Sequence, residues 1–441
     1  MASTSSLIIH FLLLLLQFVF ASFSNAQLPI TSSKPAGIIF DLERDPSTLQ
    51  YMIKINQGTP RADVKLVLDL GGIAPWLRCD KGTHESSSYH PVSCASPQCS
   101  LGNKQAVGTS ELCNGTANST CSIYTSNPVT HSVRKGELVS DLMTITSNPD
   151  SQATPVASPR RISFGCATAG SMLSGLAKGS KGVAGLGRSS SLSLVPQFAV
   201  AGRFSRIFSL ELVENSQDNN HGNRIYFGGG PYIYSDWVQM DWWNRGLKYT
   251  PLLINPKSRE EYFVDLRSIS VHNRTVPINK KLLSINKKTG IGGTKIDIRI
   301  PYTTLETSIY KAFIKTHTEW AEAWNVKNGI WRDHLVNITR VAPVAPFTAC
   351  YNASTLPRVL AFSADYFFGP SVSFIFPKNK WNIDLLDLVR VNDGVDCVGF
   401  VDGGSKPTTS IVIGARQIAF LEFDISRSRL GFVEPNLPEF D

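Results

Sequence analysis

Two aspartates stand at equivalent points in the two halves of the 441-residue chain. Asp69 lies in the stretch VLDLGG (67–72), and Asp297 lies in KIDIR (295–299). Well downstream of each aspartate comes an apolar stretch with glycine, GVAGLG (182–187) in the first half and IVIG (411–414) in the second. Each half therefore repeats the same pairing and carries one carboxyl group, a group able to exchange protons in catalysis, in the same local setting.

Four stretches that contain these residues resemble pepsin-like aspartic proteases. They are LVLDLGGIAPW (66–76), GVAGLGRSSSLSLVPQF (182–198), GGTKIDIRIPYTTLETSIY (292–310) and IVIGARQIAFLEFDISRSRLGF (411–432), and they follow the order of the family. The resemblance implies an all-β, bilobal fold with few short helices, an N-terminal lobe at 27–235, a C-terminal lobe at 236–441 and no cofactor. The glycines at 182–187 do not form a phosphate-binding G-x-G-x-x-G motif.

The resemblance also defines what catalysis would need. In this family two carboxylates about 3 Å apart share one proton, so that one activates water while the other is an acid. Each aspartate begins an Asp-Thr/Ser-Gly turn. Here Leu70 replaces the first hydroxyl residue, and Ile298 and Arg299 replace the second hydroxyl residue and its glycine. The permanent charge of Arg299 is expected to hold Asp297 ionised, which opposes the shared-proton state.

The flap tyrosine of active members is also missing, because SNPV (126–129) stands in its place. Three catalytic features are altered together, and a displacement of about 1 Å already costs about 100-fold in rate. We predict an impaired dyad. The alternative is an active or residual aspartic endopeptidase with unusual turns, since both aspartates remain.

The elements that would hold this site are mostly short strands. Apolar or alternating runs bounded by Gly, Pro and Asn predict strands at 51–55, 64–70, 138–146, 162–166, 207–212, 224–227, 262–271, 372–376, 410–413 and 430–433. Helical patterns occur at 194–198, 307–324 and 384–389. Residues 86–126 form a Cys-rich insertion, and 230–258 are expected to connect the lobes.

The N-terminus predicts secretion. Residues 7–23 are almost wholly apolar and are followed by the small-residue exit Ser24-Asn25-Ala26, which is typical of a signal peptide over 1–26. The alternative, a membrane anchor, is less favoured because the stretch is short and has no basic flank. We expect a soluble protein of the extracellular space or cell wall, with no membrane partner.

Cysteines and sequons agree with secretion. Eight cysteines form an even set that allows four disulfides, and without a C-x-x-C pair they fit zinc poorly, so no metal is predicted. The resemblance implies the pairs Cys79–Cys166 and Cys350–Cys397. It leaves four cysteines to stabilise the insertion in an open pairing: Cys94, Cys99, Cys113 and Cys121. Five N-x-S/T sequons predict glycosylation, at Asn114, Asn118, Asn273, Asn337 and Asn352.

Composition limits the partners. The chain is 42% hydrophobic and 18% charged, which argues against disorder and against a coiled coil. It carries 43 Lys plus Arg against 35 Asp plus Glu, a net charge of +8, and these charges look dispersed along the sequence. Outside the cell we expect no nucleic acid partner. An anionic wall polysaccharide or an acidic protein fits better, and simple solubility is the alternative.

Further stretches are similar to a plant group that contains extracellular dermal glycoprotein, xyloglucan-endoglucanase inhibitors, basic seed globulins and, more distantly, xylanase inhibitors. They are NITRVAPVAPFTAC (337–350), GPSV (369–372) and VDGGSKPTTSIVIG (401–414). The resemblance implies a monomeric, protease-inactive protein of plant defence that binds and inhibits a microbial endoglucanase or xylanase. A basic storage or ligand-binding globulin is the alternative.

In that group, inhibition uses a basic side chain in the loop that corresponds to 351–368, because the target cleft is acidic. Arg358 is the candidate here, and an exposed arginine without a partner is the alternative. The C-terminal segment EPNLPEFD (434–441) lacks the cysteine and cation of the group's second inhibitory loop. Trp320, Trp324 and Trp331 are a candidate carbohydrate or protein contact, although the spacing of the first two favours core packing.

Overall fold

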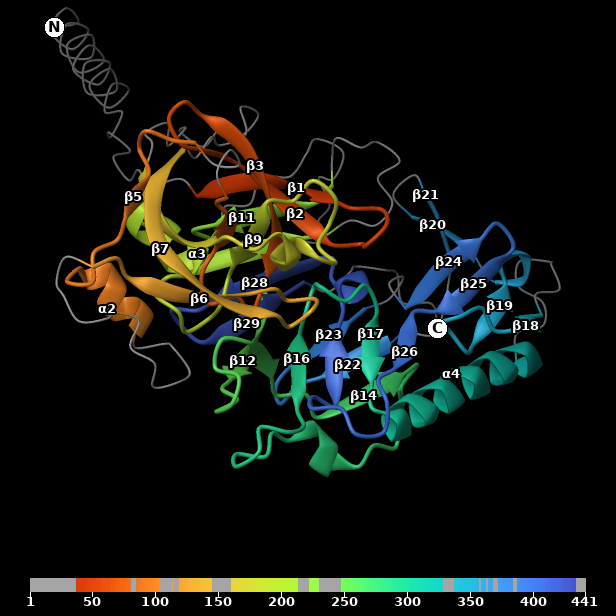
Figure 1. The fold of residues 1–441 in the computed structure, drawn as a ribbon. Helices are drawn as coiled ribbons and strands as arrows, with labels where there is room; N and C mark the ends of the chain where they lie inside the picture. The colour runs from red at the N-terminus through yellow and green to blue at the C-terminus, as the bar shows by residue number, and fades with distance from the viewer. Residues whose placement is uncertain are drawn as a thin grey trace, which may run out of the picture. The chain divides into compact units, whose positions relative to one another are not determined.

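Strands dominate the fold (Figure 1). The computed structural model describes residues 37–80, 85–103, 113, 119–144, 160–212, 222–229, 247–327, 337–356, 358–361, 364–367, 372–383 and 387–433. From Gly37 onward the chain forms one compact unit. Within the described ranges there are three α-helices: α2 (Pro97–Asn103), α3 (Leu194–Gly202) and α4 (Thr307–Lys327). None of the helices described is long and apolar enough to span a bilayer.

The first half is organised around the strand that ends at Asp69. In this arrangement β3 pairs in parallel with β9, while β4 pairs with β9 antiparallel and with β8 in parallel. The hairpin of β6 and β7 extends from the same sheet. The strands are β2 (Tyr51–Gln57), β3 (Ala62–Asp69), β4 (Trp76–Arg78), β5 (His90–Pro91), β6 (Ser122–Ser126), β7 (Val133–Thr144), β8 (Arg160–Ala167) and β9 (Gly182–Gly185).

The second half repeats this arrangement around Asp297. There β16 pairs in parallel with β27, while β17 pairs with β27 antiparallel and with β26 in parallel. The strands are β13 (Tyr262–Val264), β16 (Thr294–Ile296), β17 (Thr303–Leu305), β26 (Phe400–Asp402) and β27 (Ile411–Ile413). The duplication visible in the sequence is therefore a duplication of strand pairing.

Three smaller sheets complete the second half. One contains β14 (Ser268–Val271), β15 (Arg274–Thr275), β22 (Val372–Ile375) and β23 (Lys380–Asn382). Another contains β18 (Arg340–Val341), β19 (Cys350–Asn352), β24 (Leu388–Asn392) and β25 (Val395–Val398), and the hairpin of β20 (Arg358–Ala361) and β21 (Ala364–Phe367) stands apart.

Six antiparallel strands join the two halves. Their order is β1 (Ile38–Arg44), β11 (Arg224–Phe227), β10 (Ile207–Glu211), β28 (Phe420–Asp424), β29 (Arg429–Phe432) and β12 (Lys248–Leu253). The ring of Phe208 on β10 stacks on that of Phe423 on β28 with centroids 4.5 Å apart, and Tyr262 packs edge-on against Phe423. These buried rings connect the cores of both halves.

The disulfides match the pairs that the resemblance implied, Cys79–Cys166 and Cys350–Cys397. The pairing inside the insertion, left open by the sequence, is Cys94–Cys113 and Cys99–Cys121. The sulfurs of Cys94, Cys99 and Cys113 lie close together. Each of them belongs to a disulfide, so none is a thiolate ligand.

Each predicted strand overlaps an observed strand, with one run, 262–271, divided into β13 and β14. The predicted helix at 384–389 is wrong where it is described, because Leu388 and Val389 belong to β24, whose pairing with β25 overrides a weak local pattern. Trp320 is buried, as core packing requires, whereas the side chain of Trp324 and residue Trp331 lie outside the described residues. The lobe boundary at 235/236 and the signal peptide also lie outside them and stay predictions.

We expect Phe423→Ala to reduce the free energy of unfolding by about 3–5 kcal/mol, because it removes a buried ring from the strands that join the halves. Urea denaturation followed by fluorescence measures this change. Val200→Ala is the control, since Val200 is 81% exposed and its loss should change stability by less than about 0.5 kcal/mol. Equal effects of the two substitutions would contradict this account of the core.

Candidate functional site: an aspartate pair bridged by arginine

The two aspartates occupy matching backbone positions and both are buried. Asp69 is the last residue of β3, and its carbonyl accepts a hydrogen bond from the Leu186 N–H at 2.9 Å. Asp297 follows β16, and its N–H donates to the Ile413 carbonyl at 2.9 Å. A Cβ on Gly185 would lie 2.5 Å from the carbonyl oxygen of Ala74, so only glycine lets the strands approach this closely.

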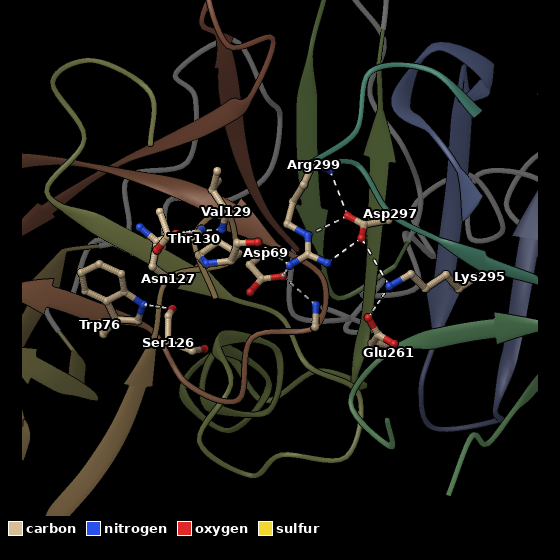
Figure 2. Close-up of polar contacts among 12 residues, drawn as sticks. Asp69, Trp76, Ser126, Asn127, Val129, Thr130, Glu261, Lys295, Asp297 and Arg299 are labelled. Carbon is tan, nitrogen blue, oxygen red and sulfur yellow. Dashed lines mark hydrogen bonds and ion pairs between the residues drawn. The ribbon is translucent and has the colours of Figure 1, made fainter. Parts of the chain in front are cut away.

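Arg299 lies between the two carboxyl groups (Figure 2). Its Nε donates to Asp297 Oδ1 at 2.8 Å and its Nη2 to Asp297 Oδ2 at 2.5 Å, a bidentate ion pair. Its Nη1 lies 3.5 Å from Asp69 Oδ1. The guanidinium therefore bridges the dyad where the resemblance implied a shared proton.

A second cation and a third carboxylate extend this network. Lys295 Nζ lies 3.6 Å from Asp297 Oδ2 and also pairs with Glu261 (Figure 2). Neither residue was among the site residues predicted from the sequence. Lys295 had a usable signal, because it stands two residues before Asp297 and side chains two apart in a strand share a face. Glu261 had no such sequence signal, since it lies far from both aspartates in the chain and comes next to Lys295 only through the pairing of β13 with β16.

The two positions where active relatives carry hydroxyls are filled by buried aliphatic side chains, Leu70 and Ile298. Neither can donate to a carboxylate. What survives is one backbone donor on each side: Gly71 N–H lies 3.0 Å from Asp69 Oδ1, and Arg299 N–H lies 3.1 Å from Asp297 Oδ1. The turns keep the positions of the carboxylates but not the hydroxyl network.

The tip of the β6–β7 hairpin, at the position of the flap, is tied down over the site. The fully buried Asn127 donates from Nδ2 to the carbonyls of Met172 and Ser174, both at 2.8 Å. Its Oδ1 accepts from the N–H groups of Val129 and Thr130. Arg299 Nη1 also lies 3.4 Å from the Pro128 carbonyl, so the dyad cation contacts the hairpin directly.

The surroundings shift the pKa values of the two aspartates in opposite directions. Burial raises the pKa of Asp69, and the charge of Arg299 opposes this only in part. Burial also acts against ionisation of Asp297, but the hydrogen bonds and charge of Arg299, with the charge of Lys295, lower the pKa of Asp297 overall. Burial disfavours the charge of Arg299 as well, yet the two aspartates raise its pKa, so it stays cationic.

Beside Asp69 lies a small pocket with room for about one water molecule, lined by residues that include Gly72, Trp76 and Tyr124. A water molecule in this pocket can contact Asp69. It cannot contact two equivalent carboxyl groups, because both oxygens of Asp297 are paired with Arg299. The arrangement holds charge and orders the hairpin. Peptide hydrolysis by an aspartate pair needs one proton shared by the two carboxyl groups, and here the guanidinium of Arg299 lies between them.

The other predicted site residues lie apart from this centre. Arg358 is the first residue of β20, paired in register with Phe367, and nothing of its side chain is described. Asn273 is exposed in the turn between β14 and β15, Asn337 is exposed, and Asn352 is partly buried and caps a short 3-10 turn. Asn114, Asn118 and residues 434–441 lie outside the described residues.

Substitution of the two aspartates should have opposite effects at neutral pH. Asp297→Asn leaves the buried Arg299 without its bidentate partner and should cost about 3–5 kcal/mol in the free energy of unfolding. Asp69→Asn, the matched control, should raise stability, because burial already disfavours that carboxylate. Urea denaturation at pH 7 measures both, and a destabilisation by Asp69→Asn that equals that of Asp297→Asn would contradict this division.

The pH dependence of Asp297 follows from the same shift. A carboxyl group whose pKa is lowered on folding stabilises the folded state above its unfolded pKa, near 4, and this contribution is lost as pH falls through the lowered value. The stability difference between wild type and Asp297→Asn should therefore be full at about pH 6–7 and shrink below about pH 4. A difference that grows on acidification would contradict it.

Both halves of the chain match a known protein family. Residues 51–229 match the family described as "Xylanase inhibitor N-terminal", and residues 261–434 match "Xylanase inhibitor C-terminal". "Probable aspartic proteinase GIP2" of Nicotiana benthamiana is 38% identical, over 95% of this chain and 93% of its own length. "Basic 7S globulin" of Glycine max is 29% identical, over 98% of this chain and 96% of its own.

Solved structures of similar fold support the same family assignment. The crystal structure of edgp superposes with a TM-score of 0.75 at 36% identity, covering 90% of this chain and 94% of that one. Conglutin gamma from lupine seeds reaches a TM-score of 0.70 at 30% identity, covering 91% and 96%. With its duplicated strands and its bridged aspartates, this chain belongs to the plant xylanase-inhibitor-like family of pepsin-like aspartic protease homologues.

Proposed function

We propose that this chain is a secreted protein without efficient proteolytic activity that binds and inhibits a microbial glycoside hydrolase. The observation that carries the first part is the guanidinium of Arg299 between Asp69 and Asp297. The bidentate ion pair keeps Asp297 ionised and places a cation between the two carboxyl groups, whereas hydrolysis requires that they share one proton.

The inhibitory part is supported by the family that matches both halves of the chain and by Arg358. Glycoside hydrolases place two acidic side chains on either side of the scissile bond. A basic side chain on a two-stranded hairpin, such as β20–β21, is a chemically complementary group for such a cleft. Arg358 is therefore the proposed contact, and the target is an endoglucanase or a xylanase.

Secretion and glycosylation are part of the proposal. They are supported by the apolar N-terminus with its small-residue exit and by four disulfides, which persist in oxidising compartments. Asn273 and Asn337 are the best acceptors among the described sequons, because both are exposed. The extracellular space or the cell wall is the proposed location.

We expect the purified protein to show no pepstatin-sensitive cleavage of denatured protein in acid, at about pH 3–6, where an aspartate dyad would be active. Asp69→Asn should behave like wild type, and pepsin assayed in parallel verifies the substrate. Pepstatin-sensitive cleavage by wild type that disappears in Asp69→Asn would overturn this part of the proposal.

Inhibition is tested with a xyloglucan-specific endoglucanase and a xylanase, each assayed with the purified protein in micromolar excess. We expect one of them to be inhibited, and Arg358→Ala to weaken inhibition by at least about tenfold, as for a buried arginine anchor in an interface. Arg61→Ala, an exposed arginine in the turn before β3, is the control and should leave inhibition unchanged. Unchanged activity of both hydrolases would refute the inhibitory role and favour the globulin alternative.

A further inference from the structure

A cationic surface in the second half is separate from both the dyad and Arg358. It consists of residues 254–259, 278–293 and 405–408, named here the lysine surface. In Figure 1 the chain between β14 and β16, which supplies its central part, lies below β12 and β16. Its exposed side chains include seven cations: Lys257, Arg259, Lys280, Lys281, Lys287, Lys288 and Lys406.

The three segments are held together by hydrogen bonds. Asn255 Nδ2 donates to the Gly290 carbonyl at 2.7 Å, which joins the first segment to the second. Gly292 N–H donates to the Thr408 carbonyl at 2.9 Å, which joins the second to the third. Within the second segment, Gly293 N–H donates to the Leu282 carbonyl at 3.0 Å. Cations that are far apart in the sequence are therefore gathered on one surface.

The charge of this surface is unbalanced. The three segments contain seven Lys and Arg and no Asp or Glu, a formal charge of +7, while the whole chain carries +8. Of the two glutamates that follow the first segment, Glu261 pairs with Lys295, whereas Glu260 accepts hydrogen bonds from Ser189 and Ser190 and adds one formal negative charge beside the surface. The prediction that the positive charges are dispersed is wrong for these segments, because the tertiary structure gathers seven of them on one surface.

Four of the lysines are presented by a repeated motif. The sequence INKK occurs at 278–281 and again at 285–288. In the first copy Asn279 Oδ1 accepts from the Lys281 N–H at 3.1 Å, and in the second Asn286 Oδ1 accepts from the Lys288 N–H at 3.0 Å. Each asparagine therefore caps a turn through the same side-chain hydrogen bond, at the start of a 3-10 helix in the first copy and of a single turn in the second, and each turn exposes two adjacent lysines.

This pattern suits a linear polyanion better than a folded acidic protein. Protein interfaces are depleted in Lys and enriched in aromatic residues at their cores. Here the three segments contain six lysines and one arginine, no Trp, Tyr or Phe, and only scattered exposed apolar residues such as Ile254 and Ile291. Lysine is a hydrated point charge that attracts anions without fixed geometry, so repeated lysine pairs match repeated carboxylates along a polymer.

We propose that the lysine surface binds an acidic polysaccharide with a carboxylate on successive sugars. This binding is independent of the dyad and of the contact proposed for Arg358, and it would hold the protein in a carboxylate-rich matrix. Because the attraction is between exposed charges, it weakens as salt rises.

The test measures the affinity of the full-length protein for polygalacturonate at about 50 mM and 200 mM salt, with neutral dextran and polyglutamate as comparison polymers. The variant Lys280→Gln/Lys281→Gln/Lys287→Gln/Lys288→Gln removes the lysines of both INKK turns. The matched control, Lys135→Gln/Lys178→Gln/Lys311→Gln/Lys315→Gln, removes the same charge from exposed positions on other elements. Thermal unfolding verifies that both variants fold.

We expect the INKK variant to lose at least about tenfold in affinity at low salt and the control less than about twofold. Wild type should bind dextran at neither salt concentration. Equal losses in the two variants would show that net charge alone attracts the polymer and would overturn the proposal. It would also be overturned if wild type bound polyglutamate but not polygalacturonate, the result expected for an acidic protein partner, or bound neither.

Discussion

The ion pair between Arg299 and Asp297 is the constraint on which the site depends. It occupies both oxygens of one carboxylate, places a cation 3.5 Å from the other, and reaches the hairpin at the Pro128 carbonyl. Removing one partner of a buried pair costs more than the pair contributes to stability, because the remaining charge is left without compensation. Loss of either partner is therefore costly, and the guanidinium occupies the space between the carboxyl groups where the family resemblance implied a shared proton.

The scaffold persists although the chemistry has changed. The parallel pairing of β3 with β9 and of β16 with β27 depends on backbone hydrogen bonds and on glycine where chains approach closely. The six strands that join the halves depend on buried aromatic rings. None of these requires a reactive dyad, so substitutions at Leu70, Ile298 and Arg299 are compatible with the fold. A fold of this kind can carry another function on its surface.

The two proposed contacts lie on elements of the second half other than those that carry the dyad. Arg358 on the β20–β21 hairpin is the single cation proposed for an acidic cleft, whereas the lysine surface presents seven exposed cations for an extended polymer. These are different kinds of recognition, one directional and one diffuse. Under the two proposals, a protein held in a carboxylate-rich matrix keeps the contact proposed for Arg358 available, because the two contacts lie on different elements.

The sequence by itself determined the strand-rich class, the duplicated aspartate motif and the altered turns, because these depend on local periodicity or on motifs contiguous in the chain. The resemblance to a known family implied two of the four disulfides. Only the tertiary structure decided that Arg299 reaches Asp69 as well as Asp297, that Asn127 ties the hairpin down, and that β24 is a strand. It alone gathered the INKK turns with Lys257 and Lys406. Contacts of this kind join residues distant in the chain, and their energies come from burial and proximity that no local pattern contains.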